Sequence, residues 1–325
     1  MKAHSVLLAL FLLIGYTINI VAQVDRNLRF THLTNDNGLP TNTIYSLCQD
    51  FKGFIWIATA NGLCKYDGRS ISVYEVEPTK GERKKGGIIR HVFEDKRHRL
   101  WVITHKGVNL YNRNKDNFNF VSVDSLNNFS RVIYQDDKGK IYMGGSGAFI
   151  YNEQTSKFDP FYVNQDETIT AFITAITSDQ KGQMWFGRMY GGLICADVEN
   201  GKLTRYKHND HNINSLISNK VTSLFTDHHG RIWIGTEDKG ICYFDSSTNK
   251  FIRIEGFPQI CVRTFAEDAE GNIWIGSENG LYIYLSDENK FINYKQNYND
   301  KYSLNDNAIY TIFKDKENNM LVGTY

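Results

Sequence analysis

The sequence predicts an all-β fold, a seven-bladed β-propeller built from four-stranded antiparallel blades. An Asp is followed six residues later by a bulky anchor residue, and this pair recurs seven times. Successive anchors are 45, 41, 43, 48, 41 and 47 residues apart. A period of roughly 40–50 residues with several short strands per unit is typical of propellers. The pairs are Asp50/Trp56, Asp95/Trp101, Asp136/Tyr142, Asp179/Trp185, Asp227/Trp233, Asp268/Trp274 and Asp315/Leu321.

Residues 1–22 are typical of a signal peptide. Lys2 is followed by an almost wholly apolar stretch from Val6 to Val21, and Ala22 precedes a plausible cleavage point at Gln23. No later stretch approaches the roughly 18 apolar residues of a membrane helix. We therefore expect an exported domain, periplasmic or extracellular, comprising residues 23–325.

Within 23–325 the repeat divides the chain into seven units. Residues 28–34 resemble the fourth-strand stretch near residue 203, so they are expected to form a closing strand for the last blade. Only two strands of unit seven, residues 309–314 and 320–325, are present, so we expect an incomplete last blade and a truncated product. The blades are expected at about 36–78, 79–122, 123–164, 165–209, 210–255, 256–296 and 297–325 (partial).

Unit five shows how one blade is built. Val221 begins a first apolar strand, residues 227–230 form a tight turn, and strands are expected at 232–236, 240–245 and 250–254. The Asp accepts backbone hydrogen bonds within the turn, and the Gly three residues later supplies a positive φ. The Trp anchor is expected to pack between blades. The Asp and anchor residues are thus interpreted as structural, not as catalytic groups or a sugar platform.

Composition excludes several classes of partner. Leaving Lys2 aside, basic and acidic residues balance at 36 each, which argues against binding to nucleic acid or an anionic membrane.

The cysteines and histidines predict neither disulfides nor a metal site. Cys64 and Cys242 occupy the same position of the repeat in different units, too far apart for a disulfide, and no disulfide framework is expected. The pairs His208/His211 and His228/His229 fit loop and turn positions better than a metal site, so no metal or cofactor is expected.

The repeat D-x-x-G-x-[IM]-W-[IF]-G/A-T/S-x-x-G-L-x-x-Y-D resembles the two-component regulator propeller repeat. It matches at residues 50–67, 179–197, 227–245 and 268–284, and residues 30–68 resemble the mature start of hybrid two-component sensors of Bacteroidetes. Unit three departs from it, with Tyr142 in place of Trp and a shortened loop. In that family the propellers precede a β-sandwich, a membrane helix, a histidine kinase, receiver modules and a DNA-binding domain.

The resemblance implies a ligand-sensing portion that recognises a glycan or oligosaccharide and controls transcription through a kinase absent from this chain. It implies downstream domains of the same polypeptide as partners and an inner-membrane anchor in a full-length parent, and it leaves a homodimer open. Loops between the second and third strands are expected to form the pocket, with Arg188 beside Tyr190 suited to an acidic or hydroxylated sugar. The candidate ligand-binding residues are Asn61, His105, Lys106, Arg188, Tyr190, Glu237, Asp238, Lys239, Glu278 and Asn279.

Two other functions compete with the sensor hypothesis. A propeller hydrolase or lyase would need a converging set of charged groups, such as the two placed carboxylates of a glycosidase, and no such set stands out. A stand-alone secreted propeller that binds carbohydrate or protein fits the same sequence. We therefore expect a binding domain and not an enzyme.

Overall fold

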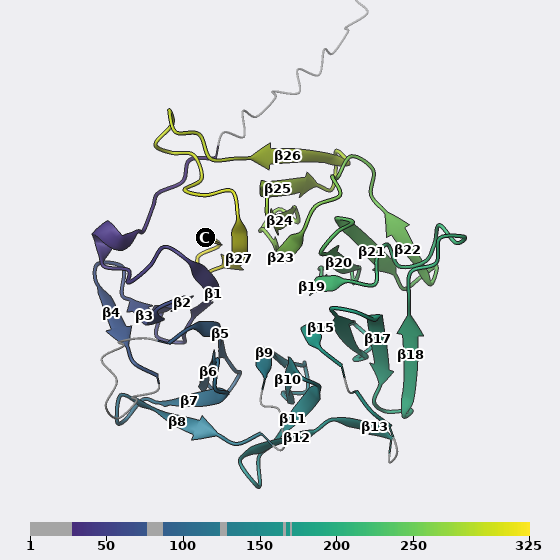
Figure 1. The fold of residues 1–325 in the computed structure, drawn as a ribbon, viewed down its shortest axis with the longest axis horizontal. Coiled ribbons are helices and arrows are strands. Elements are labelled where there is room, and N and C mark those ends of the chain that lie inside the picture. The colour runs from purple at the N-terminus through teal and green to yellow at the C-terminus, as the bar shows by residue number, and fades with distance from the viewer. Residues whose placement is uncertain (1–27, 77–86, 124–128, 165–166, 170) are drawn as a thin grey trace, which may run out of the picture.

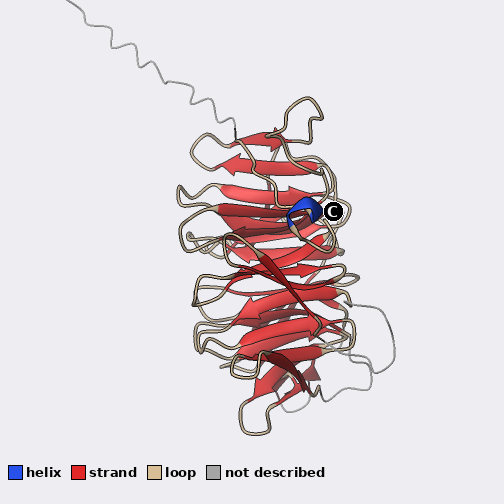
Figure 2. Ribbon diagram, turned by 90° about the vertical axis from the view of Figure 1, so that its left-hand side faces the viewer, coloured by secondary structure: helices blue, strands red, loops and turns tan. Residues whose placement is uncertain are grey.

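The chain forms a ring of β-sheets around a central axis, with the first strand of every blade nearest the centre (Figure 1). The structure is a computed structural model that describes residues 28–76, 87–123, 129–164, 167–169 and 171–325. Within these ranges, six blades have four strands each, and a two-stranded sheet holds the seventh position. The predicted all-β propeller with an incomplete last blade is thus confirmed. Seen edge-on, the blades stack into a slab with loops on both sides (Figure 2).

The strands of blades one to three follow the chain outward from the centre. Blade one holds β1 (Ile44–Gln49), β2 (Ile55–Thr59), β3 (Gly62–Tyr66) and β4 (Ile71–Tyr74). Blade two holds β5 (Ile89–Glu94), β6 (Leu100–Thr104), β7 (Val108–Asn112) and β8 (Asn117–Val121). Blade three holds β9 (Ser130–Gln135), β10 (Ile141–Gly145), β11 (Ala148–Asn152) and β12 (Lys157–Pro160).

The remaining blades repeat this order. Blade four holds β15 (Ile173–Ser178), β16 (Met184–Arg188), β17 (Gly192–Asp197) and β18 (Lys202–Tyr206). Blade five holds β19 (Val221–Thr226), β20 (Ile232–Thr236), β21 (Ile241–Asp245) and β22 (Lys250–Arg253). Blade six holds β23 (Val262–Glu267), β24 (Ile273–Ser277), β25 (Gly280–Leu285) and β26 (Lys290–Tyr294), and β27 (Ile309–Lys314) pairs with β28 (Met320–Thr324) in the seventh position.

Two short elements lie outside this scheme. The hairpin β13 (Tyr162–Asn164) and β14 (Glu167–Thr168) connects blades three and four, and no pattern in the sequence indicated it. A 3-10 helix, η1 (Asn35–Asn37), precedes blade one. The predicted signal peptide, residues 1–22, lies outside the described residues. No helix in the described ranges has the length and apolar character needed to cross a membrane.

The repeated Asp organises the turn between the first two strands of each blade. In blade five, Asp227 Oδ1 accepts the backbone N–H of Arg231 at 2.9 Å, and its Oδ2 accepts the indole N–H of Trp233 at 2.8 Å. Gly230 closes the turn at φ +79°. Where the glycine is replaced, His98 and Asn318 adopt φ values of 62° and 66°. The indoles of Trp56, Trp101, Trp185 and Trp274 donate to their own Asp in the same way.

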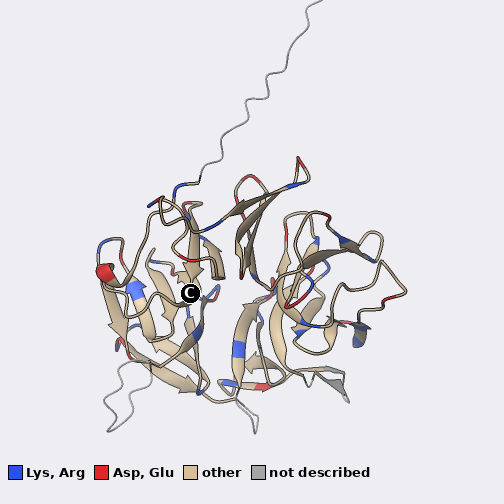
Figure 3. Ribbon diagram, turned by 45° about the horizontal axis from the view of Figure 1, so that its top comes forward, with Lys and Arg blue, Asp and Glu red and all other residues tan. Residues whose placement is uncertain are grey.

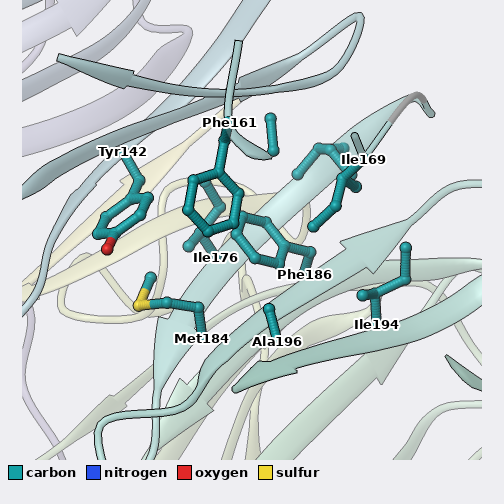
Figure 4. Close-up of a cluster of buried hydrophobic side chains, with 10 residues drawn as sticks. Tyr142, Phe161, Ile169, Ile176, Met184, Phe186, Ile194 and Ala196 are labelled. Carbon is teal, nitrogen blue, oxygen red and sulfur yellow. The ribbon is translucent and has the colours of Figure 1, made fainter. Parts of the chain in front are cut away.

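The core lies between neighbouring blades, because a blade buries its face only against the next one. Between blades three and four, Tyr142 and Phe161 pack edge to face over Ile176, Met184 and Phe186 (Figure 4). A glycine on the second strand lets adjacent blades approach. A Cβ at Gly235 would lie 2.8 Å from Cγ1 of Val262 in the following blade.

The two-stranded sheet packs directly on blade one. A Cβ at Gly323 on β28 would lie 2.8 Å from Cγ2 of Ile44 on β1. Lys316 donates its backbone N–H to Oε1 of Gln49 and its Nζ–H to the carbonyl of Asp50, both at 2.8 Å. The ring of inner strands therefore closes between blades seven and one.

The expected closing strand at residues 28–34 is not a regular strand. Its backbone hydrogen bond to a distant segment runs from Phe30 N–H to the carbonyl of Tyr302, at 2.8 Å, and the carbonyl of Thr34 accepts the local N–H groups of Asn37 and Leu39. A cavity of about 930 Å³ lies between this segment and β28, lined by both. A fourth strand needs the backbone of a third to pair with, and no described strand separates this segment from β28. Residues 28–34 pair with no strand in the described part of the chain, so the closing strand stays a prediction, although Leu28 and Phe30 pack on the core of blades six and seven.

Candidate functional site

The two ends of the ring are built differently. One end carries the Asp turns, and the other carries the hairpins between the second and third strands together with the starts of the inner strands. We call the latter the hairpin face. Basic and acidic residues are distributed over the blades and their loops, without one sign dominating the ring (Figure 3).

Short side-chain hydrogen bonds fix the hairpins. In blade five, the hydroxyl of Thr236 donates to the carbonyl of Gly240 at 2.9 Å and accepts the N–H of Lys239 at 3.0 Å. Thr59, Thr104 and Ser277 play the same part in blades one, two and six. The Thr or Ser and the Gly of the repeat therefore hold the candidate loop residues in defined positions.

A backbone bond ties each of several hairpins to the start of the inner strand. The N–H groups of Ser146, Glu237 and Glu278 donate to the carbonyls of Phe129, Lys220 and Cys261, at 2.8, 2.9 and 3.1 Å. The first residues of the inner strands consequently lie beside the predicted loop residues on the hairpin face.

The structure distributes the ten predicted residues over five blades. Glu237 and Asp238 both lie within 4 Å of Lys220, and Lys239 Nζ donates to Gln259. Glu278 Oε1 accepts the N–H of Cys261 at 3.4 Å. Asn61, His105, Lys106 and Asn279 occupy the hairpins of blades one, two and six.

Arg188 and Tyr190, the predicted sugar contacts, point in different ways. The guanidinium of Arg188 folds back to donate to the carbonyl of Gly191, and its Nε is buried without a partner. The ring of Tyr190 is 79% exposed. Of these two residues, therefore, only Tyr190 has a side chain that is accessible to a ligand.

A set of residues that the sequence analysis did not single out lies nearer the centre. In each described blade the register of the first two strands shifts after the first residue, so the second residue of the inner strand has no ladder partner. Such β-bulges re-aim side chains and are frequent beside binding sites. We call these residues the inner ring: Tyr45, Arg90, Arg131, Thr174, Thr222, Arg263 and Tyr310.

The sequence carried a signal for the inner ring. Each member stands five residues before the repeat Asp, and each is polar or aromatic beside apolar strand residues. Three of the seven are Arg, which a purely structural position facing the axis does not require. The candidate residues expected from the sequence came from the hairpins between the second and third strands and not from the inner strands, so the inner ring was missed.

Aromatic rings flank the arginines of the inner ring. Arg90 lies 5.3 Å over the ring of Phe129, and Arg131 lies 6.0 Å over that of Phe172. On the other side of the axis, Arg263 lies 4.9 Å over the ring of Tyr310. Tyr310 packs edge to face on Tyr45, with ring centres 5.3 Å apart.

The inner-ring groups influence one another's protonation. Burial lowers the pKa of Arg131 below its ordinary value, and the positive charge of Arg90 lowers it further. Burial raises the pKa of Tyr45, as does Tyr310, whereas Arg90 opposes this rise. These effects place Arg90 close to both Arg131 and Tyr45.

Neither histidine pair gathers metal ligands. His208 Nε2 contacts Asp210 and its Nδ1 contacts the Leu216 carbonyl, at 2.9 and 2.7 Å. His228 contacts Glu267 and stacks on His229. In the described part of the chain, no group of three His, Cys, Asp or Glu side chains could hold a metal ion. All five cysteines are free thiols.

Comparison with known proteins confirms the resemblance seen in the repeat. The model of the two component regulator propeller matches residues 38–61, 215–238, 256–279 and 303–325. No curated protein matches the sequence. The chain is a propeller domain that resembles the extracellular domains of hybrid two-component systems.

Solved structures show the same architecture. The extracellular domain assigned to the hybrid two-component system BT4673 of B. thetaiotaomicron is 26% identical, with a TM-score of 0.77 over 91% of this chain and 39% of that one. The corresponding domain of BT3049, from the same organism, is 24% identical, with a TM-score of 0.77 over 91% and 40%. This chain thus spans about 40% of the length of these domains. Virginiamycin B lyase from Staphylococcus aureus shares only the fold, at 15% identity and a TM-score of 0.60 over 81% and 86%.

Proposed function

We propose that the chain is the ligand-sensing propeller of a hybrid two-component sensor and that it recognises an oligosaccharide outside the cytoplasm. The observation that carries the proposal is the likeness of 91% of the chain to an extracellular domain of such a system, at 26% identity. The four matched repeats support the same family of sensors. The kinase that would control transcription belongs to a longer form of the polypeptide.

The hairpin face supplies chemistry suited to sugars. Exposed Tyr190 offers a ring on which a pyranose can stack, and the acidic and basic hairpin residues of blades five and six can bond hydroxyl groups. Hairpins tied to the inner strands keep these groups in place, which reduces the entropy lost on binding.

Signalling would follow from a shift between two arrangements of the sensor. A ligand that binds one arrangement more tightly raises its population, and the downstream domains transmit that change. We assign the propeller itself no catalytic role. Its likeness to propeller lyases extends to the fold alone.

The test is calorimetric titration of the full chain with a panel of oligosaccharides. We expect one class of oligosaccharide to bind at a single site, and Tyr190→Ala to weaken that binding severalfold, with a smaller effect of Arg188→Ala. Arg253→Ala, on the outermost strand of blade five, serves as the control and should bind normally. A folded chain that ignores every oligosaccharide but captures a partner protein would contradict the proposal and favour a protein-binding ring.

A further inference from the structure

We propose that Arg90 and Arg131 form a binding site for an anionic group, the carboxylate or sulfate of an acidic oligosaccharide, at the centre of the hairpin face. The inference rests on the function proposed above, and it adds the chemical class of the ligand and the residues that bind it. Three independent features of the structure support it.

The first feature is the backbone. A β-bulge falls at Arg90 in blade two and at Arg131 in blade three, so neither residue has a ladder partner. The innermost strands β5 and β9 that carry them are neighbours around the axis (Figure 1). Two guanidinium groups are therefore presented side by side from rigid strands and not from mobile loops.

The second feature is charge without compensation. Within the described ranges, no carboxylate pairs with Arg90 or Arg131, and Nε of Arg90 is buried without a hydrogen-bond partner. Other arginines of the chain have such partners: Arg99 pairs with Asp95, and Arg231 with Asp227. The neighbouring His91 cannot act as a counter-ion, because an imidazole is either neutral or positively charged, and burial, which lowers its pKa to about 4, keeps it neutral at pH 7.

The acidic groups of the hairpin face lie elsewhere. Glu237 follows β20 in blade five and Glu278 follows β24 in blade six, and both of them, like Arg131, influence the pKa of Cys261. Glu237 is also within 3.3 Å of Lys220. Among the side chains that the structure describes, Arg90 and Arg131 of blades two and three thus have no acidic partner, and an anion bound there would gain charge-assisted hydrogen bonds from two guanidinium groups.

The third feature is the aromatic surface around the two arginines. The rings of Phe129 and Phe172 lie 5.1 Å apart beneath Arg90 and Arg131, and Phe172 is 37% exposed. The exposed part of Phe172 therefore offers apolar surface to a sugar ring beside the two guanidinium groups. Inorganic anions need only the guanidinium groups, so an adjacent aromatic pair favours an anionic group carried on a sugar.

The experiment compares three probes with one sugar backbone: an oligogalacturonate, a sulfated galactose oligosaccharide and the neutral galactose oligosaccharide. Inorganic sulfate is a fourth probe, followed by thermal shift against chloride at equal ionic strength. The variants are Arg131→Gln, Arg90→Gln and Arg131→Lys, with the exposed Arg253→Gln of β22 as the matched control. Circular dichroism establishes that each variant is folded.

We expect one or both acidic probes to bind at least tenfold more tightly than the neutral one, and to weaken with added salt. Arg131→Gln and Arg90→Gln should each reduce this affinity tenfold or more, whereas Arg253→Gln should leave it unchanged. The affinity of Arg131→Lys should lie between those of the wild type and Arg131→Gln, because lysine keeps the positive charge but lacks the planar guanidinium group that forms two parallel hydrogen bonds. Carboxylate and sulfate are distinguished by which acidic probe binds.

The outcomes separate this inference from the proposed function. Tight binding of the neutral probe that is indifferent to both Gln variants would overturn the anion site and leave the sugar sensor intact. Stabilisation by sulfate that disappears in Arg131→Gln, with no sugar binding at all, would support the anion site and contradict the sugar sensor. Acidic probes that bind equally to the wild type and both Gln variants would overturn the inference.

Discussion

The guanidinium of Arg113 in blade two lies against the buried carboxylate of Asp50 in blade one, with 2.9 Å between Arg113 Nη1 and Asp50 Oδ2. The same oxygen accepts the indole N–H of Trp56 at 3.1 Å. Arg113 also donates through Nη2 to Oε1 of Glu94, at 2.6 Å. The repeat Asp of blade one therefore joins two blades as well as capping a turn.

Replacing Arg113 should destabilise the junction of blades one and two. Arg113→Met leaves the carboxylate of Asp50, which is fully buried, without its counter-charge. Breaking a buried pair costs about 3–5 kcal/mol, and because the side chain of Arg113 is 23% exposed we expect about 2–3 kcal/mol. Urea unfolding measures the change. Arg69→Met, at an exposed turn, is the control, and an equal loss in both variants would contradict the interpretation.

The cost of Arg113→Met should depend on pH. Burial raises the pKa of Asp50, but hydrogen bonds from Trp56 and Arg113 outweigh burial and hold the pKa below its ordinary value. The stability from this carboxylate is thus present above about pH 4 and is lost as the pH falls through the folded-state pKa. The difference between wild type and Arg113→Met should therefore be largest near pH 7 and should shrink in acid.

The carboxylate of Glu94 changes stability with pH in the direction opposite to that of Asp50, so its contribution needs a separate control. Burial raises the pKa of Glu94, so its contribution to stability improves as the pH falls. In a Glu94→Gln background, the remaining pH dependence should come from Asp50 with a clearer acid limb. A difference between wild type and Arg113→Met that grows below pH 4 in this background would show that Asp50 is not the responsible group.

The anchor of blade three is a Tyr where blade five has a Trp, so the same exchange can be tested in blade five. Tyr142 replaces the anchor Trp there, and its hydroxyl donates to Asp136 Oδ2 at 3.3 Å. Trp233→Tyr should keep such a donor for Asp227, whereas Trp233→Phe leaves Oδ2 with Arg231 as its remaining donor. We expect Trp233→Phe to be less stable than Trp233→Tyr by about 1–2 kcal/mol in urea unfolding. Equal stabilities would mean that the anchor acts through packing alone.

Cys261 reports on the centre of the hairpin face. It is half-buried, whereas the other four cysteines are buried. Burial raises the pKa of Cys261, while Arg263 and Arg131 oppose the rise. We expect a thiol reagent at pH 8 to modify Cys261 first in the native protein, ahead of the buried cysteines, whose pKa burial raises to about 12: Cys48, Cys64, Cys195 and Cys242. Cys261→Ser identifies the fast phase, and a fast phase that persists in this variant would contradict the assignment.

The sequence predicted the blades well because their signals are local. A turn between Asp50 and Trp56 is specified by seven consecutive residues, and the same pattern recurs around the ring. Whether residues 28–34 form a closing strand could not be decided from such local signals, since a strand depends on a neighbour that is distant in sequence. The hairpin β13–β14 has no repeat partner that would reveal it.

The candidate site was predicted only in part. Hairpin residues such as Tyr190 and Glu237 could be placed on one face because strand alternation fixes which loops share an end. The inner ring needed the bulges, which appear only when the register of two strands is known. The neighbourhood of Arg90 and Arg131 depends on two adjacent blades, and no spacing within either blade specifies it.

Hydrogen–deuterium exchange with the acidic probe that binds, oligogalacturonate or the sulfated galactose oligosaccharide, tests the central claim most directly, because it locates the ligand on one end of the ring. The account predicts slower exchange at residues 88–92 and 129–133 and in the hairpins of the same face, with the Asp turns at 50–54 and 227–231 unchanged. Protection confined to the Asp turns, or to the segments beside β28, would place the ligand elsewhere and contradict the account.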